Sequence, residues 1–178
     1  VGKFDPQTGD ITQKKQTTFS DTFGECMCRL AEQDPAVCAV TAAMPGGTGL
    51  LHFKEQYPNR MFDVGIAEEH AVTLAAGLAA GGMRPVVAVY QTFTQRGFDQ
   101  ILMDVALPKR HVVLCLDRAG AVPSDGETHQ GIFDISLMRS IPNLTMMTVA
   151  SRNDLEACLE WAAWKCSGPV AIRWPKMS

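Results

Sequence analysis

The sequence predicts a doubly wound α/β domain, in which a mostly parallel sheet of about six strands carries helices on both faces. Short apolar runs alternate with longer helical patterns along the chain, and parallel strands need such crossovers between them. One run, Val86–Tyr90, is apolar throughout, which is typical of an internal parallel strand that is buried on both faces. No internal repeat is evident.

The composition is that of a globular protein with a single core-forming domain. The chain has 178 residues, of which 46% are hydrophobic and 20% charged, values that argue against disorder and against two generous domains. A net charge of −3 gives no basic surface for nucleic acid. No apolar run is long enough to span a membrane, and the first residues lack a secretory signal. We therefore expect neither nucleic acid nor membrane as a partner. Because the chain does not begin with Met, we expect it to be a piece of a longer protein.

The six cysteines lie inside expected helices and strands, with no C-x-x-C pair and no metal-like spacing with histidine. We interpret them as reduced, packed thiols, which favours the cytoplasm of a bacterium or the stroma of a plastid over a secreted setting. They are Cys26, Cys28, Cys38, Cys115, Cys158 and Cys166.

The first half of the chain predicts two helices and two strands. Residues 1–18 are polar and without periodicity, so we expect a linker there and the folded domain at residues 19–178. Ser20 or Asp21 is a candidate N-cap for a helix that ends near Gln33. Further elements are expected as a strand at 36–41, a turn at 45–49, a strand at 61–66 and a helix at 71–80.

The turn at Pro45–Gly49 has the glycine content of a phosphate-binding loop. It matches neither G-x-G-x-x-G nor the P-loop pattern, so we interpret it as a turn near the ligand crevice.

The second half continues the alternation after the strand at 86–90. The segment from Gln91 to Gln100 should lead into a helix that ends near Pro108. The segment 117–131 should be a long loop, a feature that is often functional in a compact domain. The other expected elements are a strand at 111–116, a short helix at 132–139, a strand at 144–149, a helix at 151–164 and a strand at 170–174.

Glu68 is the principal candidate for chemistry. It lies where a strand turns into a small-residue helix, and ligands of open α/β sheets bind at the carboxyl ends of the strands. We expect Glu69 and His70 to face solvent or cap the helix, and Glu68 to enter the crevice. The helix dipole favours its anion and apolar burial its neutral acid, and we expect burial to dominate in a dry site. Such an acid can exchange a proton with a ring nitrogen. The alternative is a helix-capping glutamate.

The other candidates follow the ends of expected strands. Phe93 can stack on a flat heteroaromatic ring, or it can be an ordinary core residue. Arg118 and Arg173 can hold a phosphate in forked geometry, or each can be a solvated surface residue. The full set comprises Glu68, Tyr90, Phe93, Arg96, Arg118, Asp125, His129 and Arg173.

Asp125 and His129 lie in the long loop at 117–131. They can orient a substrate or move a proton. The alternative is an Asx-type turn followed by a loop histidine.

Four segments, in this order and at these distances, carry a resemblance to a known family. They are IAEEHAVTLAAGLA, VYQTFTQRGFDQ, DRAGAVPSDGETHQGIFD and GPVAIRWP. Together they resemble the pyrimidine-binding domain of the 1-deoxy-D-xylulose-5-phosphate synthase family, within the transketolase-like thiamine diphosphate enzymes. The resemblance covers nearly the whole chain. The DGETHQG loop after DRAG is its most specific part, whereas the first segment occurs across the wider superfamily.

The resemblance implies a role for each candidate residue. Glu68 matches the glutamate that hydrogen-bonds N1′ of the thiamine aminopyrimidine and so promotes deprotonation of the thiazolium C2. Phe93 matches the ring stacked on that pyrimidine, and Arg96 an arginine beside it. The remaining matches concern the substrate: Tyr90, Arg118 and Arg173 contact the phosphate of D-glyceraldehyde 3-phosphate, and Asp125 and His129 line the pocket for the acceptor and intermediate.

The resemblance also implies a reaction and its partners. Pyruvate would lose CO2 and pass its two-carbon unit to D-glyceraldehyde 3-phosphate, a step in isoprenoid, thiamine and pyridoxal biosynthesis. In that family Mg²⁺ and the diphosphate are held by another domain through a Gly-Asp-Gly motif, which this sequence lacks. We therefore expect N-terminal and C-terminal partner domains, a homodimer, and no activity from this chain alone.

Two alternatives stay open at this point. One is another transketolase-like enzyme, such as a transketolase or a 2-oxo-acid dehydrogenase beta subunit. The loop at 117–131 argues against it. The other is a non-catalytic ligand-binding module with the same fold.

Overall fold

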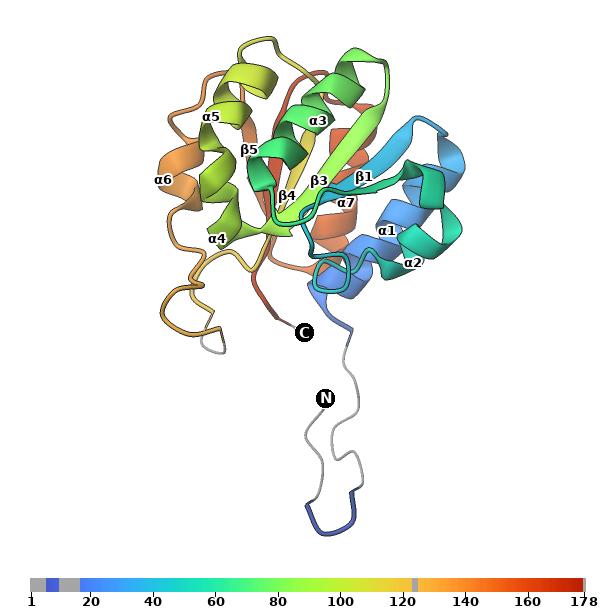
Figure 1. Ribbon diagram of the computed structural model, residues 1–178, viewed down its shortest axis with the longest axis vertical. Coiled ribbons are helices and arrows are strands. Elements are labelled where there is room, and N and C mark those ends of the chain that lie inside the picture. The colour runs from blue at the N-terminus through green and yellow to red at the C-terminus, as the bar shows by residue number, and fades with distance from the viewer. Residues whose placement is uncertain (1–5, 10–16, 123–124, 178) are drawn as a thin grey trace.

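The computed structural model describes residues 6–9, 17–122 and 125–177, and their core is one parallel sheet. Its six strands lie in the order β2-β1-β3-β4-β6-β5, as Figure 1 shows for the central ones. The predicted doubly wound fold is confirmed. The strands are β1 (Val37–Thr41), β2 (Met61–Asp63), β3 (Arg84–Tyr90), β4 (Val113–Asp117), β5 (Thr145–Thr148) and β6 (Val170–Arg173).

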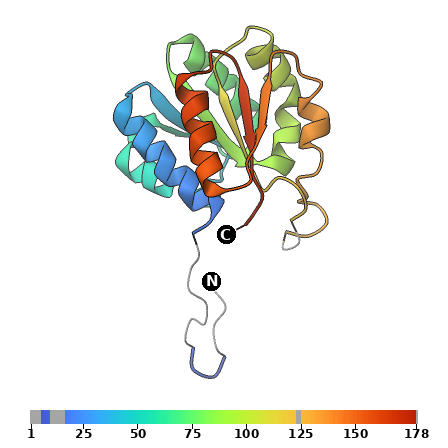
Figure 2. The same cartoon turned by 180° about the vertical axis from the view of Figure 1, so that it is seen from behind.

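Helices cover both faces of the sheet. In Figure 1 the helices α3 to α6 lie in front of it, and Figure 2 shows α1 and α7 on the opposite face. The helices are α1 (Phe19–Gln33), α2 (Leu51–Gln56), α3 (Glu68–Ala80), α4 (Gln91–Thr94), α5 (Phe98–Gln100), α6 (Asp134–Met138) and α7 (Arg152–Trp164). Shorter turns are the 3-10 helices η1 (Pro58–Arg60) and η2 (Gln95–Gly97), and the π-helix η3 (Ile101–Ala106).

Each face of the sheet has its own apolar core, because neighbouring strand residues point to opposite faces. In β3, Val86 and Ala88 pack with α1 and α7, whereas Val87 and Val89 pack with α3 and η3. Both sets are buried. This two-sided burial explains why the strand reads as a continuous apolar run.

The register of the central strands places their last residues side by side. Tyr90 at the end of β3 is opposite Asp117 at the end of β4, and Arg173 at the end of β6 is opposite Leu116. These strand ends form one edge of the sheet, which we call the carboxyl edge. The candidate residues that follow the strands are therefore brought to the same side of the molecule.

The predicted N-cap of the first helix was wrong. Thr18 caps α1, since its hydroxyl accepts a hydrogen bond from the Asp21 backbone N–H (3.1 Å) and the Asp21 carboxylate accepts one from the Thr18 backbone N–H (3.0 Å). This reciprocal capping box requires a residue three positions before Asp21. Ser20 instead donates a hydrogen bond to the Asp117 carboxylate (2.7 Å).

The segment before α3 also differs from the prediction. The helix α2 was not predicted, and the strand expected at 61–66 ends at Asp63. The Asp63 carboxylate accepts hydrogen bonds from the backbone N–H groups of Ala43 (2.8 Å) and Gly65 (3.1 Å). An Asx-type turn of this kind draws the chain out of the sheet.

The cysteines match the predicted reduced state, although only Cys26, Cys38 and Cys115 are fully packed and the other three are half-buried. All six are free thiols, and burial raises the pKa of Cys26 and of Cys38 to about 11. Such thiols stay protonated near neutral pH.

Other expectations fall partly outside the described residues. Most of the expected linker (1–5 and 10–16), residues 123–124 of the long loop and residue 178 lie outside them. Within the described ranges, no group of three or more side chains is arranged to hold a metal ion, and no helix has the length and apolarity needed to cross a membrane.

Candidate functional site

Glu68 lies buried at the carboxyl edge. It is the first residue of α3 and its side chain is 4% exposed, whereas Glu69 and His70 are exposed. The residue at the helix N-cap, Ala67, makes no side-chain cap hydrogen bond. The Glu68 side chain is thus turned away from solvent, in contrast to its two neighbours, and its entry into the ligand crevice stays a prediction.

A guanidinium group faces the buried carboxylate. Arg96 Nη1 donates to Glu68 Oε1 (3.0 Å) and Oε2 (3.1 Å), and about half of the Arg96 side chain is exposed. Buried charges in proteins are typically paired in this way. The sequence predicts that burial would dominate only in a dry, apolar site, and the Arg96 guanidinium shows that the surroundings of Glu68 are not purely apolar.

Phe93 is half-buried beside this ion pair and belongs to neither apolar core. The Arg96 guanidinium lies 5.3 Å from the centre of its ring. The His129 ring meets it edge-on at 5.3 Å, and the Tyr90 ring is stacked with it at 6.1 Å. Phe93 is thus the centre of an aromatic cluster at the site, in place of an ordinary core residue.

A second group of charges adjoins Tyr90. The Arg118 guanidinium lies 3.8 Å from the centre of the Tyr90 ring, close enough for a cation–π interaction. Arg118 has a left-handed backbone (φ +61°), which is uncommon for a residue other than glycine. Burial raises the pKa of Tyr90, partly offset by the Arg118 charge.

Asp125 joins Arg118 to Lys176. Its carboxylate accepts hydrogen bonds from both side chains. Burial acts to raise the pKa of Asp125, but the bonds from Lys176 and Arg118 outweigh it, so the pKa lies below its usual range. The carboxylate therefore stays ionised and is held between two cations.

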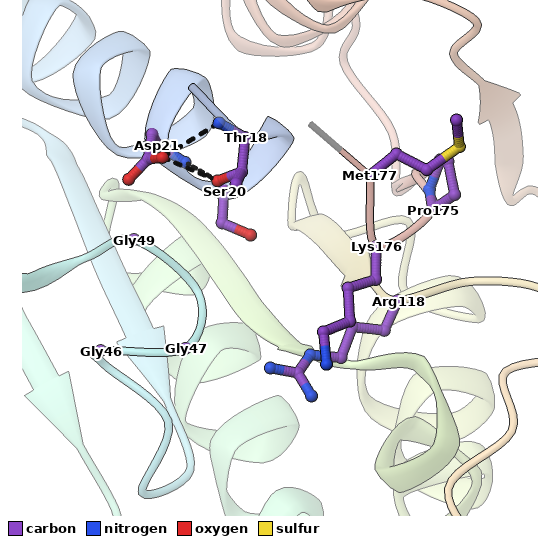
Figure 3. A pocket seen from close by; sticks show the side chains of 10 residues that line it. All are labelled: Thr18, Ser20, Asp21, Gly46, Gly47, Gly49, Arg118, Pro175, Lys176 and Met177. Atoms are coloured by element: carbon purple, nitrogen blue, oxygen red, sulfur yellow. Dashed lines mark hydrogen bonds between the residues drawn. The ribbon is translucent and has the colours of Figure 1, made fainter. Parts of the chain in front are cut away.

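A cavity of about 720 Å³ opens at this edge. The start of α1 and the glycine loop form one side, and Arg118 and the segment 175–177 form the other. Figure 3 shows the Arg118 and Lys176 side chains extending side by side from their wall, with the glycine loop across the cavity. The loop at 45–49 is thus a turn at the crevice.

Arg173 belongs to a separate pair. Its guanidinium donates to the carboxylate of Asp134, at the start of α6. Asp134 is 1% exposed and Arg173 is 15% exposed. Among the described residues, the other seven predicted site residues are linked by the ion pairs and ring contacts given above, whereas Arg173 reaches the same edge through the register of β6.

The long loop at 117–131 is closed at its base. Gly120 and Gly131 exchange two backbone hydrogen bonds (2.6 and 2.9 Å). The Gln130 side chain bonds both the N–H (2.7 Å) and the C=O (3.0 Å) of Val122. These bonds hold together the base of the loop that carries Asp125 and His129.

Five residues at this edge were missed by sequence reasoning: Ser20, Gly47, Asp117, Asp134 and Lys176. Asp117 is 2% exposed, and burial raises its pKa to about 6 against the lowering effect of the Ser20 hydroxyl. An acidic residue that ends an apolar strand is the one signal that pointed to it. Asp134 and Lys176 carry no such local signal, because each is defined by a partner far away in the sequence.

Glu68 and Phe93 together fit an aminopyrimidine ring. A buried carboxylate offers acceptor positions for a ring nitrogen and its proton, and Arg96 uses only part of this capacity. An aromatic ring beside it offers a stacking surface.

An open parallel sheet with a buried acid and an aromatic cluster at its carboxyl edge defines a ligand-binding domain of the doubly wound α/β class. The family model described as the pyrimidine-binding domain of transketolase matches residues 15–178. The chain belongs to this family of transketolase pyrimidine-binding domains.

Two bacterial relatives have high sequence identity. A 1-deoxy-D-xylulose-5-phosphate synthase from Desulfitobacterium hafniense is 52% identical over 177 residues, which are 99% of this chain and 28% of the relative. The enzyme of the same name from Symbiobacterium thermophilum is 54% identical over 175 residues, or 98% and 26% of the two chains. The chain thus spans less than a third of the length of these relatives.

Solved structures confirm the fold. A split-gene transketolase, described as an inactive beta4 tetramer, superposes with a TM-score of 0.78 at 29% identity, over 89% of this chain and 51% of the other. The transketolase of Campylobacter jejuni superposes with a TM-score of 0.79 at 21% identity, over 89% and 26% of the two chains.

Proposed function

We propose that this chain is the pyrimidine-binding domain of a 1-deoxy-D-xylulose-5-phosphate synthase. The whole enzyme would condense pyruvate and D-glyceraldehyde 3-phosphate into 1-deoxy-D-xylulose 5-phosphate with loss of CO2. The relatives at 52% and 54% identity carry that name. The observation that carries the proposal is the buried Glu68 carboxylate beside Phe93 at the carboxyl edge.

In this proposal Glu68 and Phe93 hold the aminopyrimidine of thiamine diphosphate. When bound, the cofactor supplies an acidic C2–H and an electron sink for decarboxylation. Glu68 accepts a hydrogen bond at the ring nitrogen and thereby controls a proton there, work that contributes typically about 10²- to 10⁴-fold in rate. Arg96 orients the carboxylate, since it bonds both of its oxygens.

The second group of charges would hold the aldehyde substrate. Arg118 lines the cavity beside Tyr90, and a guanidinium matches the oxygens of a phosphate. Arg173 would add a second guanidinium from the end of β6. Asp125 and His129 would face the reacting end of the substrate from the loop at 117–131.

The partners of the domain are part of the proposal. Mg²⁺ and the diphosphate would be held by a separate N-terminal domain, with a C-terminal domain completing a cytoplasmic homodimer. The much greater length of the relatives supports additional domains. A structure described as a split gene transketolase, inactive beta4 tetramer, of which this chain covers 51%, is consistent with our expectation that this chain alone turns over nothing.

The test is Glu68→Ala in a complete synthase, made by placing residues 1–178 in the matching segment of the Desulfitobacterium hafniense relative. We expect loss of C2 proton exchange of bound thiamine diphosphate, measured by NMR, together with loss of product. The expected fall in rate is on the order of 10²-fold or more, the usual contribution of a positioned acid or base.

Glu69→Ala is the matched control, because it removes the adjacent glutamate from the exposed side of the same helix turn. Its exchange rate should stay at the parent value. Persistent exchange in Glu68→Ala at the parent rate would show that the role given to Glu68 is wrong.

A further inference from the structure

We propose that Gly47 is a specificity-determining residue of the aldehyde-phosphate site, because its missing side chain leaves the space in which the Tyr90 ring lies. The inference rests on the function proposed above. It adds Gly47, which lines the same cavity as Arg118, as a positioning residue that acts through Tyr90 and Arg118.

The contact between Gly47 and Tyr90 leaves no room for a methyl group. A β-carbon on Gly47 would lie 1.6 Å from the Tyr90 hydroxyl oxygen, 2.6 Å from Cζ and 3.1 Å from Cε1. The Gly47 backbone is free of the left-handed conformations that favour glycine elsewhere in the loop. Glycine is therefore required here for close approach, and any side chain would have to displace the phenol ring.

The loop itself is held in place and cannot retreat from the ring. Gly49 packs on α1 so closely that a β-carbon there would lie 1.9 Å from the Ser20 carbonyl oxygen. The Thr48 hydroxyl and backbone N–H both donate to the Met44 carbonyl (2.8 and 3.0 Å). Thr48 is fully buried. A methyl group on Gly47 would thus move Tyr90 in preference to the loop.

Displacement of the Tyr90 ring would change the position of the Arg118 guanidinium in the proposed substrate site. The centre of the Tyr90 ring lies 3.8 Å from the Arg118 guanidinium. The same ring is also stacked with Phe93. Arg118 also lines the cavity that faces the glycine loop. A shift of about 1 Å in a positioned group can cost on the order of 10²-fold in rate.

The first experiment measures the geometry in the 178-residue chain. NMR cross-peaks between the Tyr90 ring and the Arg118 side chain should be present in the parent and lost in Gly47→Ala. Gly168→Ala is the control, because a β-carbon at Gly168 meets nothing closer than 4.0 Å and its loop precedes β6, at the opposite edge of the sheet. It should keep the cross-peaks. Cross-peaks that persist in Gly47→Ala would overturn the inference.

The second experiment measures the consequence in the complete synthase described above. Gly47→Ala should raise the KM for D-glyceraldehyde 3-phosphate by about tenfold or more, equivalent to a loss of about 1.4 kcal/mol. The KM for pyruvate should stay within about twofold, the range of a neutral substitution. In a Tyr90→Ala background the same change at Gly47 should have no further effect. A full additional rise there would contradict an action through Tyr90.

The outcomes separate this inference from the proposed function. If Arg118→Ala leaves the KM for the aldehyde phosphate unchanged, the assignment of the substrate site fails. If Arg118→Ala raises that KM and Gly47→Ala does not, only the inference about Gly47 fails. Should Gly47→Ala not fold, the double variant Gly47→Ala/Tyr90→Leu has room for the methyl group. Recovery of folding would support the contact, and failure to recover would overturn it.

Discussion

Most charged residues at the carboxyl edge form ion pairs with one another. This pairing determines which of their polar atoms can bind a ligand. Glu68 faces Arg96, Asp134 faces Arg173, and Asp125 is shared by two cations. Most of these pairs join residues from different elements, although Arg118 and Asp125 both lie in the loop at 117–131. Asp117 differs, because its buried carboxylate accepts a hydrogen bond from the neutral Ser20 hydroxyl.

Asp117 should make stability depend on pH. Burial raises its pKa from 3.8 to about 6 in the folded protein, so between these values the folded state keeps a proton that the unfolded chain has lost. The free energy of unfolding therefore falls as pH rises through this window, by on the order of 3 kcal/mol in total. Asp117→Asn cannot ionise but can still accept the Ser20 bond. Urea unfolding at pH 4.5 and pH 7 should show the variant gaining stability relative to the parent at the higher pH.

Asp99→Asn is the control for this measurement, since Asp99 is exposed. The difference in free energy of unfolding between Asp99→Asn and the parent should not change between about pH 4 and 6. An offset for Asp117→Asn that is equal at both pH values would contradict the assignment of this titration to Asp117.

Arg173 should matter for folding as well as for substrate. Removing it leaves Asp134, which is 1% exposed, as a buried carboxylate without its cation, a change that costs about 3 to 5 kcal/mol. Arg118→Ala is the matched comparison, because Asp125 retains Lys176 and the loss should be smaller. Urea unfolding of both variants tests this. Arg173→Ala/Asp134→Asn should recover part of the lost stability, and a double variant no more stable than Arg173→Ala would refute the buried-charge explanation.

The sequence could predict part of the set of residues that gather at this edge, but not how they pair. Glu68 was predictable because it follows an apolar pair at a strand-to-helix junction, a local feature. Its partner Arg96 is 28 residues away and Asp134 is 39 residues from Arg173. The choice among several nearby cations depends on tertiary distances, which no spacing rule contains.

At the level of elements, prediction succeeded for strands that are buried on both faces. It failed where a side chain forms hydrogen bonds with backbone N–H groups and so sets the end of an element. The central strands β3 and β4 are apolar except for Arg84 at the start of β3 and Asp117 at the end of β4, and they were predicted to within a few residues of their observed bounds. The edge strand β2 was predicted too long, because the Asp63 carboxylate bonds two backbone N–H groups and ends it. Likewise the N-cap of α1 depends on a reciprocal bond between Thr18 and Asp21.

Loss of that capping box should weaken α1 measurably. Thr18→Ala should lower the free energy of unfolding by about 1 kcal/mol, the usual cost of removing a hydroxyl N-cap. Ser151→Ala should cost a similar amount in α7, where Ser151 and Asp154 form the same motif. Thr17→Ala is the control, since the neighbouring threonine is not the cap. Chemical unfolding of the three variants tests this, and equal losses for Thr17→Ala and Thr18→Ala would contradict the role of the cap.

At the scale of the whole molecule, the faces of the sheet carry the two apolar cores and its carboxyl edge carries the candidate site. The strands β1, β3, β4 and β6 are mostly buried along their length, whereas the candidate site residues lie at the carboxyl edge of the sheet. Several large apolar side chains are nevertheless exposed around the domain, among them Ile66 (82%), which lies two residues before Glu68. In the proposed enzyme, such a side chain beside the site is suited to contact with a partner domain.

These features predict that the isolated chain folds but has no synthase activity. It encloses two apolar cores of its own, so far-UV circular dichroism should show the helices, and chemical unfolding should be cooperative. The purified 178-residue chain, given pyruvate, D-glyceraldehyde 3-phosphate, thiamine diphosphate and Mg²⁺, should release no CO2, because in our proposal the diphosphate is held by another domain. The same segment inside the Desulfitobacterium hafniense relative should restore turnover. Product formed by the isolated chain would show that the cofactor site is complete within these residues, and an inactive but folded chimera would show that the segment does not supply the pyrimidine half of that site.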